Sequence, residues 1–402
     1  MKGFQVLFRS LRSRNFRLFF VGQGVSLIGT WMQQTAMSWL VYRMTNSAFL
    51  LGLVGFSSQI PAFFLAPFAG VAADRWNRHR IIVITQSLAL VQALLLSVLA
   101  FTDSITIGHI IPLSIFIGLI NAVDMPTRQS FMLEMVEGKE DLANAIALNS
   151  SMFNGARLIG PSVAGLVVSA AGEGVCFVIN ALSFSAVIVS LLLMKLKPRE
   201  AAAPAAPVLH RLREGFSYVF GSAPIRRILF LLALVSLMGF PFIILMPVFA
   251  RDILGGDART LGFLMGATGL GALAGAVALA FRKQTRGLGA WIPYAVSIFG
   301  AGLFALSFSR ALWISLFFAL IAGFGMMVHI ASSNTLLQSI ADDDKRGRVM
   351  SFYTMALIGV APLGSLMLGS LAGAIGAPLT LVISGFSCVA GAFLIMGRRG
   401  RP

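Results

Sequence analysis

The sequence predicts an all-α membrane protein with twelve transmembrane helices in two pseudo-symmetric six-helix bundles. Of its 402 residues, 57% are hydrophobic and 11% are charged, which leaves too few charges to cover a water-soluble surface of this size. Apolar runs of about 20 residues or more recur along the chain, and each is long enough to cross the hydrocarbon core of a bilayer as a helix. The short alternating segments typical of a membrane β-barrel do not occur in the sequence.

The breaks between the apolar runs give the order of the expected helices. Their ranges are 16–42, 49–73, 81–102, 107–132, 143–171, 174–196, 224–250, 259–281, 288–309, 311–340, 347–373 and 376–397. An even number of spans places both ends of the chain on the same side of the membrane.

The net charge of +16 follows from this topology and does not indicate a nucleic-acid-binding patch. Lys and Arg gather at the two chain ends and in the loops on the same side, whereas the other side is left with Arg43, Arg251, Arg259 and Arg310. Cytoplasmic segments of membrane proteins carry such an excess of Lys and Arg. We therefore expect a multi-pass protein with cytoplasmic N- and C-termini.

An Ala- and Pro-rich segment divides the chain into two halves. We expect an N-terminal six-helix bundle at 1–196, a cytoplasmic linker at 197–223 and a C-terminal six-helix bundle at 224–402. The end of the linker is basic and amphipathic, which predicts that it lies along the lipid surface. The two halves resemble each other weakly, and a repeated six-helix unit with a site between the repeats is typical of alternating-access transporters.

The loop after the second expected helix contains Gly70, Asp74, Arg75, Arg78 and Arg80. It resembles the Gly-xxx-Asp-Arg-xx-Arg-x-Arg loop of the major facilitator superfamily, at the place where that superfamily has it. The resemblance implies that Asp74 pairs with neighbouring helix ends and closes a cytoplasmic gate formed with Gly70, Arg75 and Arg78. The alternative is that the arginines only set the topology.

The fifth expected helix contains Gly160, Pro161 and Gly165, preceded by Asn154 and Arg157. The first three residues resemble the antiporter motif of the same superfamily, Gly-Pro-xx-Gly-Gly, with alanine in place of one glycine. The resemblance implies export in exchange for protons. The alternative is an ordinary membrane helix kinked by its proline.

Four further segments resemble a bacterial branch of the superfamily that includes enterobactin exporters and macrolide and multidrug efflux proteins. These segments are Thr30–Gln34, Trp39–Ser47, Asp124–Gln129 and Asp141–Ala145. The resemblance covers essentially the whole chain and implies a location in the bacterial inner membrane. Because members of this branch export chemically different molecules, the resemblance does not identify a substrate.

The expected helices contain three charges well inside the membrane: Asp124, Arg128 and Arg157. A charged group in hydrocarbon costs at least about 2.5 to 3.5 kcal/mol, and such groups often mark a transport pathway. We expect Asp124 to carry the coupling proton, with Arg128 or Arg157 as its partner and His329 as a second candidate. The alternatives are a permanent ion pair that joins helices, and a histidine that serves only packing.

A substrate cavity is expected between the halves, near mid-membrane. Its candidate lining residues are Gln33, Gln34, Met37, Asn121, Asn154, Phe240, Met246 and His329. Flexible methionine and aromatic contacts suit amphipathic substrates of varied shape. For the polar residues of the first helix, the alternative is that they join helices by hydrogen bonds. Trp39 and Tyr42 are interpreted as residues of the aromatic belt at the membrane surface.

The remaining patterns indicate packing and not chemistry. Gly271 and Gly275 are spaced for close helix contact, and Cys176 and Cys388 lie in apolar segments without metal-ligand spacing. The sequence contains no phosphate-binding loop, and we expect no cofactor, no metal and no enzymatic activity.

These features together predict a monomeric proton-coupled antiporter that exports an amphipathic organic molecule such as a drug or siderophore. Its partners are the substrate, protons and the lipid bilayer. Two alternatives stay open: a nutrient symporter or uniporter of the same fold, and a membrane sensor or partner protein that does not transport.

Overall fold

The computed structural model describes residues 9–136, 138–196, 216–282, 287–343 and 345–397, without the side chains of residues 66–75, 139, 396 and 397. The described residues are helical almost throughout and contain no strand. They group into two compact units, Met1–Met37 with Ile60–Ala205 and Ser38–Gln59 with Ala206–Pro402. Most of the predicted linker, residues 197–215, lies outside the described residues, so the predicted division at 197–223 stays a prediction.

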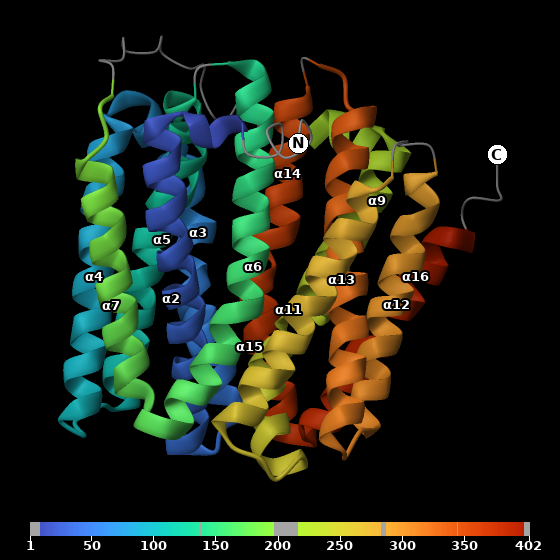
Figure 1. The fold of residues 1–402 in the computed structure, drawn as a ribbon. Helices are drawn as coiled ribbons and strands as arrows, with labels where there is room; N and C mark the ends of the chain where they lie inside the picture. The colour runs from blue at the N-terminus through green and yellow to red at the C-terminus, as the bar shows by residue number, and fades with distance from the viewer. Residues whose placement is uncertain (1–8, 137, 197–215, 283–286, 344, 398–402) are drawn as a thin grey trace. The chain divides into compact units, whose positions relative to one another are not determined.

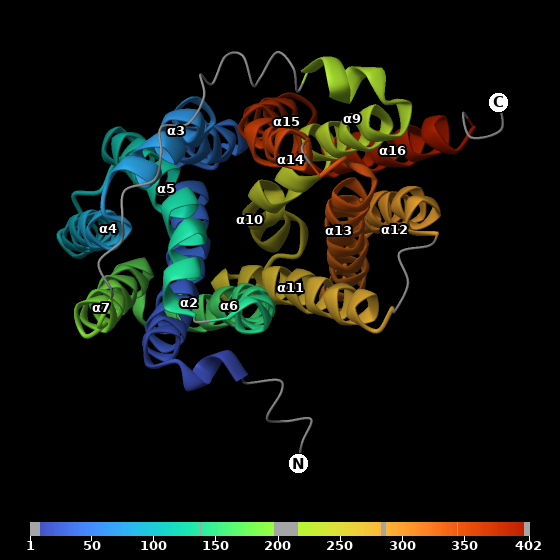
Figure 2. The ribbon, with the colours of Figure 1, turned by 90° about the horizontal axis from the view of Figure 1, so that it is seen from above.

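Unit 1 holds most of the first seven helical elements. They are η1 (Arg9–Arg12), α2 (Arg14–Thr45), α3 (Ala48–Arg75), α4 (Arg78–Phe101), α5 (Ile107–Met135), α6 (Lys139–Ala171) and α7 (Glu173–Leu192), of which the end of α2 and the start of α3 belong to unit 2. Asn77 begins α4 by accepting a hydrogen bond from the backbone of Arg80. Helix α4 packs against α5 and α7 along its length (Figures 1 and 2).

Unit 2 is built from the remaining helices. They are α9 (Ala223–Met238), η2 (Phe240–Leu245), α10 (Met246–Val248), η3 (Phe249–Ile253), α11 (Ala258–Ala280), α12 (Leu288–Phe308), α13 (Leu312–Ile340), α14 (Arg346–Thr354), η4 (Met355–Gly359), α15 (Ala361–Ile375) and α16 (Ala377–Gly397). Helix α13 lies between α11 and α12, and α12 also packs on α16 (Figure 2).

Glycines allow several of the helices in unit 2 to touch backbone to backbone. A methyl group on Gly271 would collide with the carbonyl oxygen of Leu320, and one on Gly323 would collide with that of Thr268, so α11 and α13 fit together only without these side chains. A Cβ on Gly52 of α3 would lie 2.9 Å from the Cα of Gly369 in α15. The close-packing role predicted for Gly271 is confirmed.

Two helices predicted to be continuous are interrupted in the structure. The seventh is split into α9, η2, α10 and η3 after Gly239, where Pro241 has no amide hydrogen to continue the helix. The eleventh widens into the π-helical segment η4 before Pro362. The second irregular stretch has a partner in α9, since Ser236 Oγ donates a 3.1 Å hydrogen bond to the carbonyl oxygen of Leu357 in η4.

The last two helices in each half of the sequence are joined in the same way. Gly172 separates α6 from α7 with a φ of 84°, and Gly376 separates α15 from α16 with a φ of 85°. Glycine adopts this conformation without steric cost. The matching turns agree with the weak repeat read from the sequence.

Ten helical segments of the described chain are long and apolar enough to cross a membrane. Helices α2 and α6, with 32 and 33 residues, are also long enough but carry more polar side chains. The predicted all-α membrane fold is confirmed.

Candidate functional site

Asp124 forms a polar cluster between α4 and α5, inside unit 1. Its Oδ1 accepts hydrogen bonds from Thr85 Oγ1 at 2.7 Å and from Gln86 Nε2 at 2.9 Å. Its Oδ2 forms an ion pair with Arg128, one turn further along α5. The residue is 3% exposed. Three donors therefore surround a carboxylate that is almost completely removed from solvent.

Arg128 is the partner of Asp124, as its position at i+4 predicts. One donor of the Arg128 guanidinium is unsatisfied, because its buried Nε has no hydrogen-bond partner among the described residues. Among the described side chains, the other buried carboxylate is Glu173, but it begins α7 whereas Asp124 lies inside α5. Asp124 is therefore the one buried carboxylate among the described side chains that lies in the interior of a helix long enough to cross the membrane.

Arg157 lies in a different environment from Asp124. Its guanidinium carbon is 5.7 Å from the centre of the Trp31 ring, within the range of a cation–π contact. Phe153, one turn before Arg157, meets the same ring edge-on at 5.9 Å. The nearby Asn154 is buried and donates a 2.9 Å hydrogen bond to the carbonyl oxygen of Ser150. The result is a partly exposed aromatic and cationic cluster on α2 and α6.

Gln33 belongs to a buried amide network, although the sequence suggested that it lines a cavity. Its Nε2 donates to Gln92 Oε1 at 3.0 Å, and its Oε1 accepts from Asn180 Nδ2 at 2.8 Å. Asn180 in turn accepts a hydrogen bond from Ser183. Gln33 is only 9% exposed, so the network joins α2, α4 and α7, as the alternative interpretation of these polar residues expected.

His329 is the centre of a second buried cluster, inside unit 2. It is 0% exposed, and its Nδ1 lies 3.4 Å from Ser333 Oγ. Neither His329 Nε2 nor Ser332 Oγ has a hydrogen-bond partner among the described residues. The imidazole faces the ring of Phe240 at the interruption after α9, with 6.4 Å between the ring centres. An unsatisfied polar pair at this depth is costly unless a proton, water or ligand meets it.

The interpretation of Tyr42 as a residue of the aromatic belt is wrong. Tyr42 is 4% exposed, and its hydroxyl forms a hydrogen bond with Asp252 of η3. Arg251 donates a 2.7 Å hydrogen bond to Asn46 and lies 6.0 Å from the Tyr42 ring. Trp39 is buried as well. Tyr42 and Asn46 attach the end of α2 to η3, and neither Tyr42 nor Trp39 is exposed to lipid.

The predicted gate loop is only partly described. Gly70, Asp74 and Arg75 lie in the last turns of α3, but nothing is described of the Asp74 and Arg75 side chains. Arg78 is buried at the start of α4, and its Nη1 lies 3.2 Å from both the carbonyl oxygen of Ser130 and Oε1 of Glu134. It therefore holds α4 to α5, and the gate role of Asp74 stays a prediction.

The residues of the predicted antiporter motif lie within the continuous helix α6. A Cβ on Gly160 would be 2.5 Å from Trp31 Cβ and 2.9 Å from the carbonyl oxygen of Ile28. Pro161 and Gly165 are buried beside it. The motif thus brings α6 and α2 into close contact next to the cluster of Trp31 and Arg157.

The other cavity candidates are distributed differently. Gln34 and Asn121 are exposed, Met37 and Phe240 are partly exposed, and Met246 is fully buried. Met246 is packed inside unit 2, so it does not line an open space in this arrangement.

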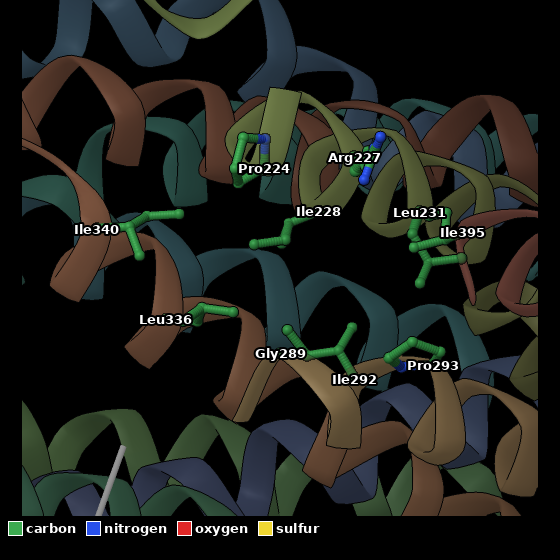
Figure 3. Close-up of a pocket in the computed structure, with 10 residues that line it drawn as sticks. All are labelled: Pro224, Arg227, Ile228, Leu231, Gly289, Ile292, Pro293, Leu336, Ile340 and Ile395. Atoms are coloured by element: carbon green, nitrogen blue, oxygen red, sulfur yellow. The ribbon is translucent and has the colours of Figure 1, made fainter. Parts of the chain in front are cut away.

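A pocket of about 280 Å³ lies inside unit 2, at one end of α9, α12, α13 and α16 (Figure 3). Its lining is apolar except for Arg227, with Ile228 and Leu231 of α9 on one wall and Leu336 of α13 opposite. None of the predicted cavity residues line it. Among the described residues, no group of His, Cys, Asp and Glu is arranged to hold a metal ion.

Sequence reasoning missed the residues that complete these clusters. Thr85 and Gln86 are the donors to Asp124, and Asn180 completes the network of Gln33. The available signal was the presence of polar residues in otherwise apolar helices, but which helix they face depends on packing. Asp252 was missed because it lies at a helix end, where acids are common.

Comparison with known proteins agrees with these features. A family model described as transmembrane secretion effector matches residues 6–400. The chain is 25% identical to the staphyloferrin A transporter of Staphylococcus aureus, covering 95% of this chain and 96% of the relative. It is also 25% identical to the multidrug efflux pump Tap of Mycolicibacterium fortuitum, covering 90% of this chain and 88% of that protein.

Two further comparisons point the same way. The enterobactin exporter EntS of Shigella boydii is 25% identical, with 92% of this chain and 87% of the exporter covered. Among solved structures, a bacterial homologue of the lysosomal transporter Spinster, in an inward-facing and occupied conformation, matches with a TM-score of 0.73 at 15% identity. That match covers 96% of this chain and 97% of the homologue and shows the shared fold. The chain therefore belongs to the transmembrane secretion effector family of the major facilitator superfamily of membrane transporters.

Proposed function

We propose that the protein is a proton-coupled antiporter that exports an amphipathic organic small molecule by alternating access. Three relatives are described as a staphyloferrin A transporter, a multidrug efflux pump and an enterobactin exporter, which supports a drug-like or siderophore-like substrate. The antiport mechanism is supported by the chemistry of this chain's own membrane helices.

The observation that carries the proposal is the environment of Asp124. A buried carboxylate inside a membrane helix is costly unless it is paired, and Arg128, Thr85 and Gln86 provide the partners. When a proton binds Asp124, the carboxylate loses its charge, and the hydrogen bonds that it accepts from Thr85 and Gln86 of α4 become weaker. Protonation therefore weakens the contact between α4 and α5, which gives proton binding a way to change helix packing.

Substitution of Asp124 by asparagine tests this proposal. Asparagine keeps the size of the side chain but binds no proton. In proteoliposomes with an imposed pH gradient, we expect the D124N protein to lose gradient-driven substrate accumulation. Substrate binding and downhill exchange should persist, because neither requires net proton movement.

Glu173→Gln is the matched control, since Glu173 is the other buried carboxylate among the described side chains. We expect this variant to retain gradient-driven transport. Uphill transport by the Asp124 variant at the normal rate would place the coupling site elsewhere, and His329, with its unsatisfied Nε2, would then be the next residue to test.

The same assay separates the alternative functions. An antiporter accumulates substrate in the compartment that protons leave, and a symporter accumulates it in the compartment that protons enter. A uniporter only equilibrates the substrate, whatever the pH gradient. A sensor or partner protein would bind the substrate without moving it under any gradient.

The proposed substrate contacts come from the clusters described above. Arg157 and Trp31 offer a cation and an aromatic face, Met37 and Phe240 offer partly exposed apolar surface, and His329 offers a free ring nitrogen. We place the protein in the bacterial inner membrane as a monomer with both termini in the cytoplasm, where Asp74 closes the gate.

A further inference from the structure

A basic pocket lies at one end of unit 1, between η1, the start of α2 and the residues that follow α7. It has a volume of about 570 Å³. Its lining residues are Arg9, Arg12, Ser13, Arg14, Asn15, Asp141 and Lys195. The lining thus contains four cations and one carboxylate.

Hydrogen bonds fix the walls of this basic pocket. Ser10 donates from its backbone nitrogen to Asn144 Oδ1 at 3.0 Å, and Ser13 Oγ donates to the carbonyl oxygen of Met135 at 2.7 Å. Asn15 and Lys195 form a reciprocal pair, in which Asn15 Nδ2 donates to the Lys195 carbonyl at 2.9 Å and the Lys195 backbone nitrogen donates to Asn15 Oδ1 at 3.1 Å. The pocket is therefore built into the ends of α2, α5, α6 and α7.

Asp141, the carboxylate of the lining, is already neutralised by an ion pair with Arg9. Arg9 forms ion pairs with Asp141 and with Glu140 at the start of α6. The hydrogen bond to Glu140 and the nearby charge of Asp141 raise the pKa of Arg9, which stays charged. Three cations of the lining, Arg12, Arg14 and Lys195, form no ion pair with the described residues.

Three such cations around one cavity repel one another, and an anion placed among them removes that repulsion. Guanidinium groups bind phosphate oxygens in pairs, and an ammonium group adds a point charge. The pocket lies where membrane helices end, which is the depth of lipid headgroups. Basic pockets between membrane helices are suited to anionic headgroups.

We propose that Arg12, Arg14 and Lys195 bind the phosphate group of an anionic phospholipid at the surface of the membrane. The proposal is independent of the coupling role of Asp124. If instead these cations only set the topology, they would show no preference between lipids beyond that of any other surface cation.

Lipid titration of the full chain in a neutral detergent tests the proposal. The probe is short-chain phosphatidylglycerol, and binding is followed by native mass spectrometry with phosphatidylcholine as the zwitterionic reference. We expect the double variant R12Q/R14Q to lose affinity for phosphatidylglycerol by about 30-fold, equivalent to about 1 kcal/mol for each cation removed. Affinity for phosphatidylcholine should change little.

The control is the double variant R17Q/R80Q. Arg17 and Arg80 are exposed and do not line the pocket, but their replacement changes the net charge by the same amount. An equal loss in both double variants, or equal binding of the two lipids by the natural chain, would overturn the proposal. Lys195→Gln provides a second test that leaves the backbone hydrogen bonds to Asn15 in place, with an expected loss of about fivefold.

Inorganic phosphate separates a lipid from a soluble anion as the ligand. If the site binds a phospholipid, inorganic phosphate at the same concentration as phosphatidylglycerol should leave the lipid bound. Complete displacement at equal concentration would assign the site to a soluble phosphate and overturn the lipid proposal.

Discussion

Gln33 and Gln34 are neighbours in sequence, yet their side chains meet different surroundings. Gln33 lies inside the amide network with Gln92 and Asn180, whereas Gln34 is exposed. The side chains of successive helical residues point about 100° apart, so Gln33 and Gln34 cannot both face the same neighbouring helix. Both were predicted as cavity candidates because the sequence contains no information about the neighbouring helices.

The amide network should contribute measurably to stability. Replacing Asn180 with leucine removes the donor to Gln33 Oε1 and the acceptor for Ser183. Because interhelical hydrogen bonds in membranes are modest, we expect a loss of about 1 to 2 kcal/mol in the free energy of unfolding, measured by thermal unfolding in detergent. Transport coupling should be unchanged.

Ser185→Ala is the control on the same helix, since Ser185 donates a long 3.4 Å hydrogen bond to the Ala181 carbonyl within α7. It should change stability by less than about 0.5 kcal/mol. A similar effect of both substitutions would show that the network has no special role.

Asp124 shows what residue-level reasoning does predict. Asp124 could be identified because acidic residues are rare inside apolar helices. The i+4 spacing then identified Arg128 as its partner. Thr85 and Gln86 lie 39 and 38 residues away in the chain, so their contribution followed only from the packing of α4 on α5.

At the scale of elements, helix existence was predictable and helix continuity was not. The apolar runs predicted where each membrane helix lies. An apolar run looks the same, however, whether its backbone forms one regular helix or an interrupted one. Gly239 with Pro241 was a visible signal for the first interruption, whereas Pro362 marks the second only in part, because it does not show that the preceding residues Met355–Gly359 form a π-helix. Its shape depends on partners such as Ser236 in another helix.

The contact between α11 and α13 provides a prediction at this scale. Gly271→Ala or Gly323→Ala adds a methyl group where the carbonyl of Leu320 or Thr268 already lies. We expect each to lower the free energy of unfolding by about 1 to 3 kcal/mol through overpacking, measured by thermal unfolding of the purified protein.

Gly155→Ala is the matched control within α6. No heavy atom lies within 4 Å of the Cβ that would be added there. Because alanine favours the helix over glycine, the control should be neutral or stabilise the protein by up to about 1 kcal/mol. Destabilisation of the same size in all three variants would contradict the packing argument.

At the scale of the whole molecule, charge asymmetry predicts how the chain lies in the membrane. A reporter fused at residue 205 or 399 should report the cytoplasm, and one at Gly256, between η3 and α11, should report the periplasm. Phosphatase and fluorescent-protein fusions measure the two sides. A periplasmic signal from residue 205 would overturn the twelve-helix topology.

The fold class and family could be predicted at this scale because composition, apolar runs and motifs are properties of the chain itself. The grouping of residues into units could not. Ser38–Gln59 belongs with unit 2 although it precedes most of unit 1 in sequence. Contacts such as Tyr42 with Asp252 join residues separated by 210 positions, and no periodicity predicts them.

The contact between Gly52 and Gly369 has a consequence for how this protein can change over generations. Each residue has only a hydrogen atom at the point where the two backbones meet. Elsewhere in a core, a larger side chain on one helix can be offset by a smaller one opposite, but no residue is smaller than glycine. Neither position therefore has a compensating partner, and a method that finds contacts from paired substitutions would miss this contact between α3 and α15.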